Sequence, residues 1–288
     1  MNYSNLKILI LGSSGLLGSV LSNKLKNIGY KIFLPPKKVI NSVASVETIR
    51  DLILKEGITK VINLIANTNV DDCEEFPLKA YQSNVKTLEK FIDVFAKTGI
   101  HLIHLSTDQV YFGKGPHFED SPNPCNVYAI TKYLAEYVAS KVNSTILRTN
   151  FTGKSLLKNR TSFSDWIVDS IKNEKEIKLF NDIYFSPLAI KDLCKYLVMV
   201  IESKNRGLYN LGSRNAISKA EFGCELIRNL GLNPDLISIV NSGYLNRKAL
   251  RPNDMSMSVK KFEDKFGLTL PTICETNKLI LQDYLNDY

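Results

Sequence analysis

The sequence predicts an α/β protein with a doubly wound parallel sheet of the Rossmann type, followed by a smaller C-terminal lobe. Up to about residue 150, short apolar segments alternate with helical patterns of 10–20 residues. This alternation is typical of a parallel sheet that is covered by helices on both faces. The first apolar segment also runs directly into the glycine-rich stretch GSSGLLG and then into a helical pattern, as in dinucleotide-binding folds.

The strands expected in this part are short apolar runs that end at glycine or at polar residues. In chain order they are LKILILG (6–12), YKIFL (30–34), KVINLIA (60–66), HLIHLS (101–106) and STILRTN (144–150). The helices expected between them repeat apolar residues at helical spacing, and the first ends at Gly29, a residue type common at helix C-termini. These helices cover residues 16–29, 46–57, 77–99 and 128–141.

After residue 150 the regular alternation fades. Helical patterns cover 162–172, 188–202, 218–230, 259–267 and 273–287, and a short strand pattern, GLYNLG, covers 207–212. We therefore expect a dinucleotide-binding domain over residues 1–150 and a smaller lobe over residues 151–288. The lobe is expected to build on the edge of the main sheet, so that the boundary is interleaved.

The composition excludes several classes of protein. The formal charge is +8, but the lysines are scattered and form no run of five or six, which disfavours nucleic-acid binding. A basic site for an anionic small molecule and a general surface bias explain the charge equally well. The five cysteines are far apart and form no CxxC, and the three histidines have no ligand spacing, so we expect neither disulfides nor a metal site. With no signal peptide and no membrane span in the sequence, the cytoplasm is the expected location.

The glycine loop predicts a phosphate-binding turn. Gly12, Gly15 and Gly18 have the spacing G-x-x-G-x-x-G, between a strand and a helix of the first βαβ unit. Glycines allow the backbone to approach a pyrophosphate, and the amides and dipole of the helix N-terminus then bind its charge. A glycine-rich turn that binds nothing is the alternative.

The end of the second strand indicates which dinucleotide is bound. An acidic residue that binds the ribose is expected there, but IFLPPKK contains none and ends in Lys37 and Lys38. Two cations suit a 2′-phosphate, so NADP(H) is favoured and NAD(H) is the alternative. Both lysines could equally be solvated surface residues.

A second set of polar residues closes the fourth strand and opens the next helix. Ser106, Thr107 and Asp108 end the strand, where ligands of doubly wound sheets bind. Tyr128 and Lys132 follow, four residues apart at the start of the helix. Alone, this pair could be an ordinary neighbouring pair on one helix face.

With these three motifs in chain order, the sequence resembles the extended short-chain dehydrogenase/reductases. The closest resemblance is to the dTDP-4-dehydrorhamnose reductase family, and it runs from residue 7 to about residue 258. The segments similar to motifs of that family are VINLIANTNVDDCEE (61–75), STDQVY (106–111), NPCNVYAITKYLAE (123–136), ILRTNF (146–151), NDIYFSP (181–187) and ALRPNDMSM (249–257).

The resemblance implies NADPH-dependent reduction of the 4-keto group of a nucleotide-activated 6-deoxyhexose, such as dTDP-4-dehydrorhamnose, in deoxysugar and cell-surface polysaccharide biosynthesis. The catalytic candidates are Thr107, which binds the carbonyl oxygen, Tyr128, which donates a proton, and Lys132, which favours the phenolate and binds the nicotinamide ribose. The cofactor-binding candidates are Gly12, Ser14, Gly15, Leu16, Gly18, Lys37, Lys38, Ala66, Asn67, Asn84, Tyr128 and Lys132. The substrate-binding candidates are Ser106, Thr107, Asp108, Gln109, Asn150, Phe151 and Arg251.

Departures from the family pattern leave the sugar open. Gln109 stands for a tyrosine, Phe151 for a tryptophan, Asn150 for a serine and Ala129 for a glycine. Two other functions stay open as well. An epimerase or epimerase-reductase would need further acid/base groups, for which His117 and Cys125 are candidates, and some relatives are NADP-binding regulatory subunits, such as the partner of methionine adenosyltransferase. The expected partners are a nucleotide sugar and, as an option, a second copy of the chain in a homodimer.

Overall fold

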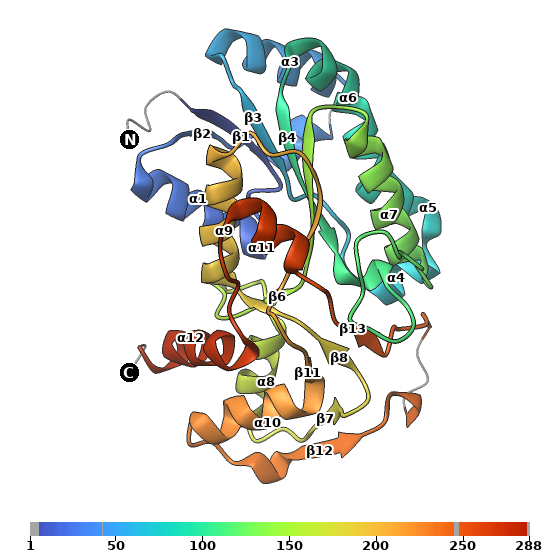
Figure 1. The fold of residues 1–288 in the computed structure, drawn as a ribbon, viewed down its shortest axis with the longest axis vertical. Coiled ribbons are helices and arrows are strands. Elements are labelled where there is room, and N and C mark those ends of the chain that lie inside the picture. Colours follow the sequence, from blue (N-terminus) through green and yellow to red (C-terminus); the bar gives the residue numbers. More distant parts are fainter. Residues whose placement is uncertain (1–5, 42, 245–247, 287–288) are drawn as a thin grey trace. The chain divides into compact units, whose positions relative to one another are not determined.

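The computed structural model describes residues 6–41, 43–244 and 248–286, and the chain forms two compact units (Figure 1). Each unit is assembled from separate stretches of the sequence. The first unit takes its described residues from Met1–Thr107, Asn126–Arg148 and Cys194–Tyr209, and the second from Asp108–Cys125, Thr149–Leu193 and Asn210–Tyr288. The chain therefore leaves the first unit directly after Thr107 and returns to it at Asn126.

The first unit is built on a six-stranded sheet with the order β10-β5-β4-β3-β1-β2, in which β2, β1, β3 and β4 pair in parallel. Its strands are β1 (Lys7–Leu11), β2 (Lys31–Phe33), β3 (Lys60–Asn63), β4 (His101–Thr107), β5 (Ser144–Thr149) and β10 (Gly207–Leu211). The strand order reverses between β1 and β3, and ligands of doubly wound sheets bind at such a reversal. The predicted fold class is confirmed.

Helices cover both faces of this sheet. They are α1 (Leu16–Ile28), α2 (Lys37–Ile40), α3 (Ser45–Glu56), α4 (Val70–Glu75), α5 (Pro77–Tyr81), α6 (Thr87–Thr98), α7 (Val127–Ser140) and α9 (Ile190–Glu202). In Figure 1, α3, α6 and α7 lie along one face, and α1 and α9 lie on the other. Alternate strand residues, such as Leu9 and Leu11, pack with α3, α6 and α7 in one apolar core, because successive side chains of a strand point to opposite faces.

Several elements of the first unit differ from the sequence prediction, which contains neither α2 nor α4 and places the helix at 188–202, now α9, in the C-terminal lobe. The helix predicted over 77–99 is interrupted by a π-helical segment, η2 (Gln82–Lys86), between α5 and α6. The strand predicted at 207–212 was assigned to the C-terminal lobe, but it forms β10, an edge strand of the central sheet. Gly29 ends α1 in the left-handed conformation, with φ 99°, as the sequence predicts.

The second unit combines short strands with helices around its own core. Its elements are η3 (Asp108–Val110), β6 (Phe151–Thr152), α8 (Phe163–Lys172), β7 (Ile177–Phe180), β8 (Tyr184–Phe185), β9 (Leu188–Ala189), β11 (Ile217–Ser218), α10 (Lys219–Asn229), η4 (Pro234–Leu236), β12 (Ile237–Val240), η5 (Ser242–Tyr244), β13 (Asp254–Met255), α11 (Lys260–Phe266) and α12 (Ile273–Leu285). β8 pairs with β11 and β13, β7 with β12, and β6 with β9. These two- to four-residue strands were absent from the sequence prediction, because they are too short to show a period of two.

A buried ion pair joins α7 to the sheet of the first unit. Arg148, on β5, donates from Nε and Nη2 to the two carboxylate oxygens of Glu136, on α7, at 2.9 and 2.7 Å. The two side chains are 2% and 4% exposed, and the hydroxyl of Ser106, on β4, donates to the same carboxylate. One carboxylate thus holds α7, β4 and β5 together.

We expect Arg148→Met to lower the free energy of unfolding by about 3–5 kcal/mol, because it leaves a carboxylate buried without its cation. The double variant Glu136→Gln/Arg148→Met, which removes both charges, should recover part of this loss. Urea unfolding measures both. Lys260→Met is the control, since it breaks an exposed pair with Asp264 and should cost less than about 1 kcal/mol. Equal losses for Arg148→Met and Lys260→Met would contradict the assignment.

Candidate active site

The loop between β1 and α1 requires glycine at two positions. Gly12 has φ +88°, and a Cβ there would lie 3.0 Å from the backbone of Leu64 and Ile65, which follow β3. A Cβ at Gly18 would lie 2.4 Å from the carbonyl oxygen of Gly12. The first turn of α1 therefore packs directly on the loop, and the loop packs on the chain after β3, at the point where the strand order reverses.

The N-terminus of α1 fits a pyrophosphate. Its N-cap is Gly15, and no side chain caps the helix. The amides of the first turn have no intrahelical acceptor, so they and the helix dipole can bind an anion. Ser14 is exposed and Leu16 is half-buried at this end. The cofactor-binding role of these residues stays a prediction that the local geometry supports.

Asn84 holds the chain segment that follows β3. Its Oδ1 accepts from the backbone amide of Asn67 at 2.6 Å, and its Nδ2 donates to the Asn67 carbonyl at 3.2 Å and to Thr131 Oγ1, on α7, at 2.9 Å. Asn84 is 1% exposed and lies in η2, and π-helical segments often occur at functional sites. Asn84 therefore positions Ala66 and Asn67, which are half-buried, on the edge where β1 and β3 end.

α7 presents a buried polar face to the end of β4. The side chain of Asn126 caps the helix by accepting from the amide of Ala129 at 2.8 Å. Tyr128, Lys132 and Glu136 follow at intervals of four residues, so they lie on one face, and all three are buried. Lys132 Nζ donates to the carbonyl oxygen of Leu105 at 2.6 Å, which fixes this face against the last residues of β4.

The charge state of Lys132 is sensitive to pH near neutrality. Burial lowers the pKa of its amine to about 8, although the carboxylate of Glu136 acts in the opposite direction. Burial and the charge of Lys132 hold the pKa of His104 well below its usual range, so His104 is neutral. An ammonium one helical turn from a buried phenol favours the phenolate form. The pair Tyr128 and Lys132 can therefore hold and release a proton.

Of the two hydroxyls at the end of β4, Thr107 is the better candidate for contact with a substrate. The proton of Ser106 is donated to Glu136, so Ser106 contributes to the buried network of the first unit. Thr107 is the last residue of β4 and is 6% exposed.

The predicted substrate-binding residues beyond Thr107 lie in the second unit. Asp108 and Gln109 form η3, and Asp108 Oδ2 accepts from Asn150 Nδ2 at 2.6 Å. Phe151 is half-buried in β6, and its strand pairs with β9. Arg251 is half-buried and donates to the carbonyl oxygen of Ala249 at 3.3 Å. Asp108 and Asn150 are therefore brought together directly.

His117 has a packing role. Its ring stacks on Tyr111 with centroids 4.8 Å apart and planes 4° apart, and its Nε2 lies 3.0 Å from the carbonyl oxygen of Asp254. His117 is 7% exposed. Cys125, the other acid/base candidate, is half-buried.

The sequence prediction missed Lys219, the first residue of α10. Its Nζ lies 3.2 Å from the ring centroid of Phe185 and 4.4 Å from that of Phe163. Burial lowers the pKa of its amine to about 7, and the charge of Asp108 opposes this shift. A signal was present in the sequence, because a cation directly after the N-cap Ser218 opposes the helix dipole.

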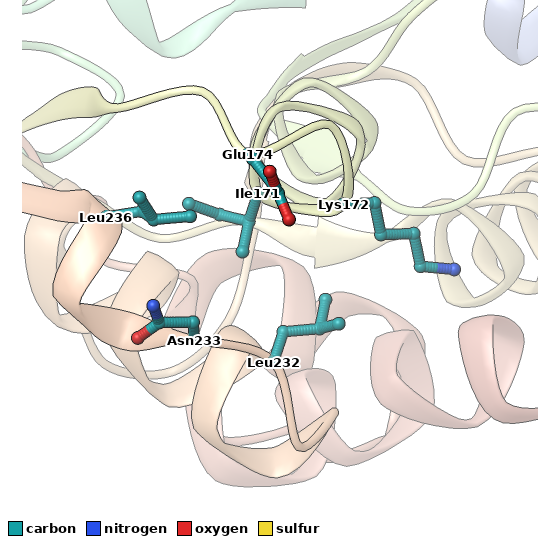
Figure 2. Close-up of a pocket in the computed structure, with 6 residues that line it drawn as sticks. All are labelled: Ile171, Lys172, Glu174, Leu232, Asn233 and Leu236. Atoms are coloured by element: carbon teal, nitrogen blue, oxygen red, sulfur yellow. The ribbon is translucent and has the colours of Figure 1, made fainter.

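The last two predicted cofactor-binding residues follow β2. Lys37 and Lys38 are exposed at the start of α2, shortly after β2. A surface pocket of the second unit, shown in Figure 2, contains none of the predicted site residues and is lined by Ile171, Lys172, Glu174, Leu232, Asn233 and Leu236.

Within the described ranges, no three His, Cys, Asp or Glu side chains gather as they would around a metal ion. Over the same ranges, every helix is too short or too polar to cross a bilayer.

The sheet order, the glycine loop and the Tyr–Lys face on α7 define an extended short-chain dehydrogenase/reductase. A sequence model of the family described as "RmlD substrate binding domain" matches residues 6–286, and the chain belongs to this family.

Relatives with curated names resemble the chain over most of its length. It is 28% identical to the spore coat polysaccharide biosynthesis protein SpsK of Bacillus subtilis, with 90% of this chain and 91% of SpsK covered. It is 27% identical to the dTDP-4-dehydrorhamnose reductase of Escherichia coli K12, with 92% and 94% covered. The crystal structure of dTDP-4-dehydrorhamnose reductase from Bacillus anthracis has a TM-score of 0.86 at 23% identity and covers 96% of this chain and 98% of its own, a likeness of fold.

We expect Gly18→Ala to destabilise the protein by about 1–3 kcal/mol, because its Cβ would overlap the backbone of Gly12 and Ser13. The same displacement should weaken NADPH binding by roughly tenfold or more, about 1.4 kcal/mol. Urea unfolding and fluorescence titration with NADPH measure the two effects. Gly243→Ala is the matched control, since a Cβ there meets nothing within 4 Å. Unchanged NADPH affinity in Gly18→Ala would argue against the loop as the pyrophosphate site.

Proposed function

We propose that the protein is an NADPH-dependent reductase of the 4-keto group of a nucleotide-activated 6-deoxyhexose, in deoxysugar and cell-surface polysaccharide biosynthesis. The names of the relatives support a sugar-modifying role, and that of the E. coli protein supports a keto sugar. The observation that carries the proposal is the buried face of α7, where Lys132 Nζ is bound 2.6 Å from the Leu105 carbonyl oxygen and Tyr128 lies one turn away.

The residues of the chain account for the proton that the reaction needs. When bound, NADPH supplies the hydride for the carbonyl carbon. Tyr128 donates the proton that the carbonyl oxygen takes up, since a phenol is a sufficient acid when a neighbouring ammonium stabilises the phenolate. Lys132 provides this ammonium, and Thr107 donates a hydrogen bond that holds the carbonyl oxygen beside Tyr128. The buried bonds of Lys132 and Glu136 keep these groups in place before substrate binds.

Two features of the chain bear on specificity. Lys37 and Lys38 are exposed beyond the end of β2, where two cations favour a cofactor with a 2′-phosphate. Gln109 and Phe151 stand where the rhamnose-synthesis enzymes carry tyrosine and tryptophan. We therefore propose the class of 4-keto-6-deoxy sugars as substrates, with dTDP-4-dehydrorhamnose as one member.

To test this proposal, the purified protein is incubated with NADPH or NADH and with dTDP-, UDP-, GDP- or CDP-linked 4-keto-6-deoxy sugars, and consumption of the cofactor is measured. We expect NADPH to be consumed with at least one sugar, and NMR of the product gives the configuration at C4. Tyr128→Phe should lower kcat by at least about 10²-fold, because the proton donor is lost. NADPH binding should persist in this variant.

Full turnover by Tyr128→Phe would overturn the assignment of the proton donor. Binding of NADPH without reduction of any sugar would contradict the proposed function and would favour the regulatory alternative.

The reaction should also depend on pH. Lys132 is charged below its pKa of about 8 and neutral above it. Because kcat/KM reports the ionisations of the free enzyme, we expect it to fall by up to about tenfold per pH unit above pH 8. Initial rates at low substrate concentration measure the profile. A kcat/KM that stays level up to about pH 10 would show that the charge of Lys132 is not needed.

A further inference from the structure

Two side chains hold the start of α7, the helix that carries Tyr128 and Lys132. Asn126, the N-cap, accepts from the amide of Ala129 at 2.8 Å. Glu74, on α4, accepts through Oε2 from the amide of Val127 at 3.0 Å. The first amides of a helix have no intrahelical acceptor, and here a carboxylate from another element binds one of them. The position at which α7 begins is therefore set partly by α4.

α4 is itself held in place, so that Glu74 is presented in a fixed position. The side chain of Asn69 caps α4 by accepting from the amide of Asp72 at 3.0 Å. The Asp72 carboxylate also accepts from Asn67 Nδ2 at 2.5 Å and pairs with Lys79. These bonds lie at the start of the helix, and Glu74 lies at its end.

Glu74 contributes a charge as well as a hydrogen bond. It is half-buried, and water screens a charge less there than at a fully exposed position. The amide that it binds belongs to the residue directly before Tyr128, so the charge lies at the first turn of α7. Asn126 shows that a neutral side chain suffices to cap this helix. The charge of Glu74 therefore has its main effect on the neighbouring ionisable group, the phenol of Tyr128.

Two positive influences act on this phenol. Tyr128 is the second residue of α7, where the helix dipole is positive, and Lys132 lies one turn further on the same face. Both favour the phenolate form, and Tyr128 is only 6% exposed, so that water screens them weakly. A proton donor must keep its proton until the substrate is bound. A phenol under these two influences alone would lose its proton too readily.

The Glu74 carboxylate acts in the opposite direction. A negative charge at a helix N-terminus neutralises part of the positive end of the dipole. A negative charge near a phenol also favours its protonated form. Glu74 thus compensates for part of the effect of the dipole and of Lys132.

Other ionisable groups lie on the elements that pack against α7, namely α4, α5, η2, α6 and β4. Asp72 pairs with Lys79, Lys86 pairs with Glu89, and His104 is neutral. The others are Asp71, Cys73, Glu75, Lys90, Asp93 and Lys97. Glu74 carries the carboxylate that is bonded to the first turn of α7.

We propose that Glu74 is a positioning residue for Tyr128, whose carboxylate fixes the first turn of α7 and keeps the phenol protonated near neutral pH. This inference deepens the proposed function, and it rests on that function only in taking Tyr128 as the proton donor.

The test follows the ionisation of Tyr128 by NMR, in protein whose tyrosines are labelled at Cζ. The signal of Tyr128 is the one that is absent from Tyr128→Phe. Glu74→Gln keeps an oxygen that can accept from the Val127 amide but removes the charge. We expect this variant to lower the pKa of Tyr128 by about half a unit to one unit. In the reductase assay, the alkaline fall of kcat/KM should begin at a correspondingly lower pH.

Three further variants separate the charge from the hydrogen bond. Glu75→Gln removes the same charge from the next residue, which is exposed, and should change the pKa of Tyr128 by less than about 0.2 units. Glu74→Asp keeps the charge and should retain most of the wild-type titration. Glu74→Met removes both charge and acceptor, so it should lower the urea midpoint as well, whereas Glu74→Gln should keep the midpoint close to that of the wild type.

An unchanged or raised pKa of Tyr128 in Glu74→Gln would overturn the proposal and leave Glu74 as a helix cap alone. An equally large decrease in Glu75→Gln would overturn it too, because the effect would then belong to the general charge of α4. The titration needs neither cofactor nor sugar. Failure of the reductase assay would therefore count against the proposed function and leave this test intact.

Discussion

The carboxylate of Glu136 is the group on which the geometry of the first unit depends. It binds Arg148 on β5 and Ser106 on β4, and it lies one helical turn from Lys132 on α7. Burial opposes the charge of Lys132, and the negative charge of Glu136 compensates for part of this effect. The same side chain therefore fixes the position of the helix and keeps the lysine ionisable near neutral pH.

The loop between β1 and α1 depends on close backbone packing. Gly12 and Gly18 allow three segments to meet where the strand order reverses, with no side chain between them. Asn84 then ties the segment after β3 to Thr131 on α7. The segment after β3 and α7 are thus connected through the buried side-chain amide of Asn84, which lies in the π-helical segment η2.

The sequence predicted the features that local patterns determine. The strands up to residue 150, the helix that ends at Gly29 and the order of the main motifs were predicted correctly, since apolar periodicity and turn residues encode them. The π-helical turn, the place of β10 in the central sheet and the short strands of the second unit were missed, because they depend on contacts distant in sequence. Lys219 was missed for the same reason, because the rings that surround its amine come from residues 163 and 185.

The connectivity of the sheet bears on how the protein folds during synthesis. β5 ends at Thr149, but its neighbour β10 begins only at Gly207, after a long stretch that belongs mainly to the other unit. During synthesis, β1 to β5 leave the ribosome before β10, so β5 is an unpaired edge strand until β10 has been made. An unpaired edge strand can pair with other chains. β5 has polar residues at both ends, Ser144 and Thr149, and the charge of Arg148 within it. This transient edge should therefore aggregate less readily than an entirely apolar strand would.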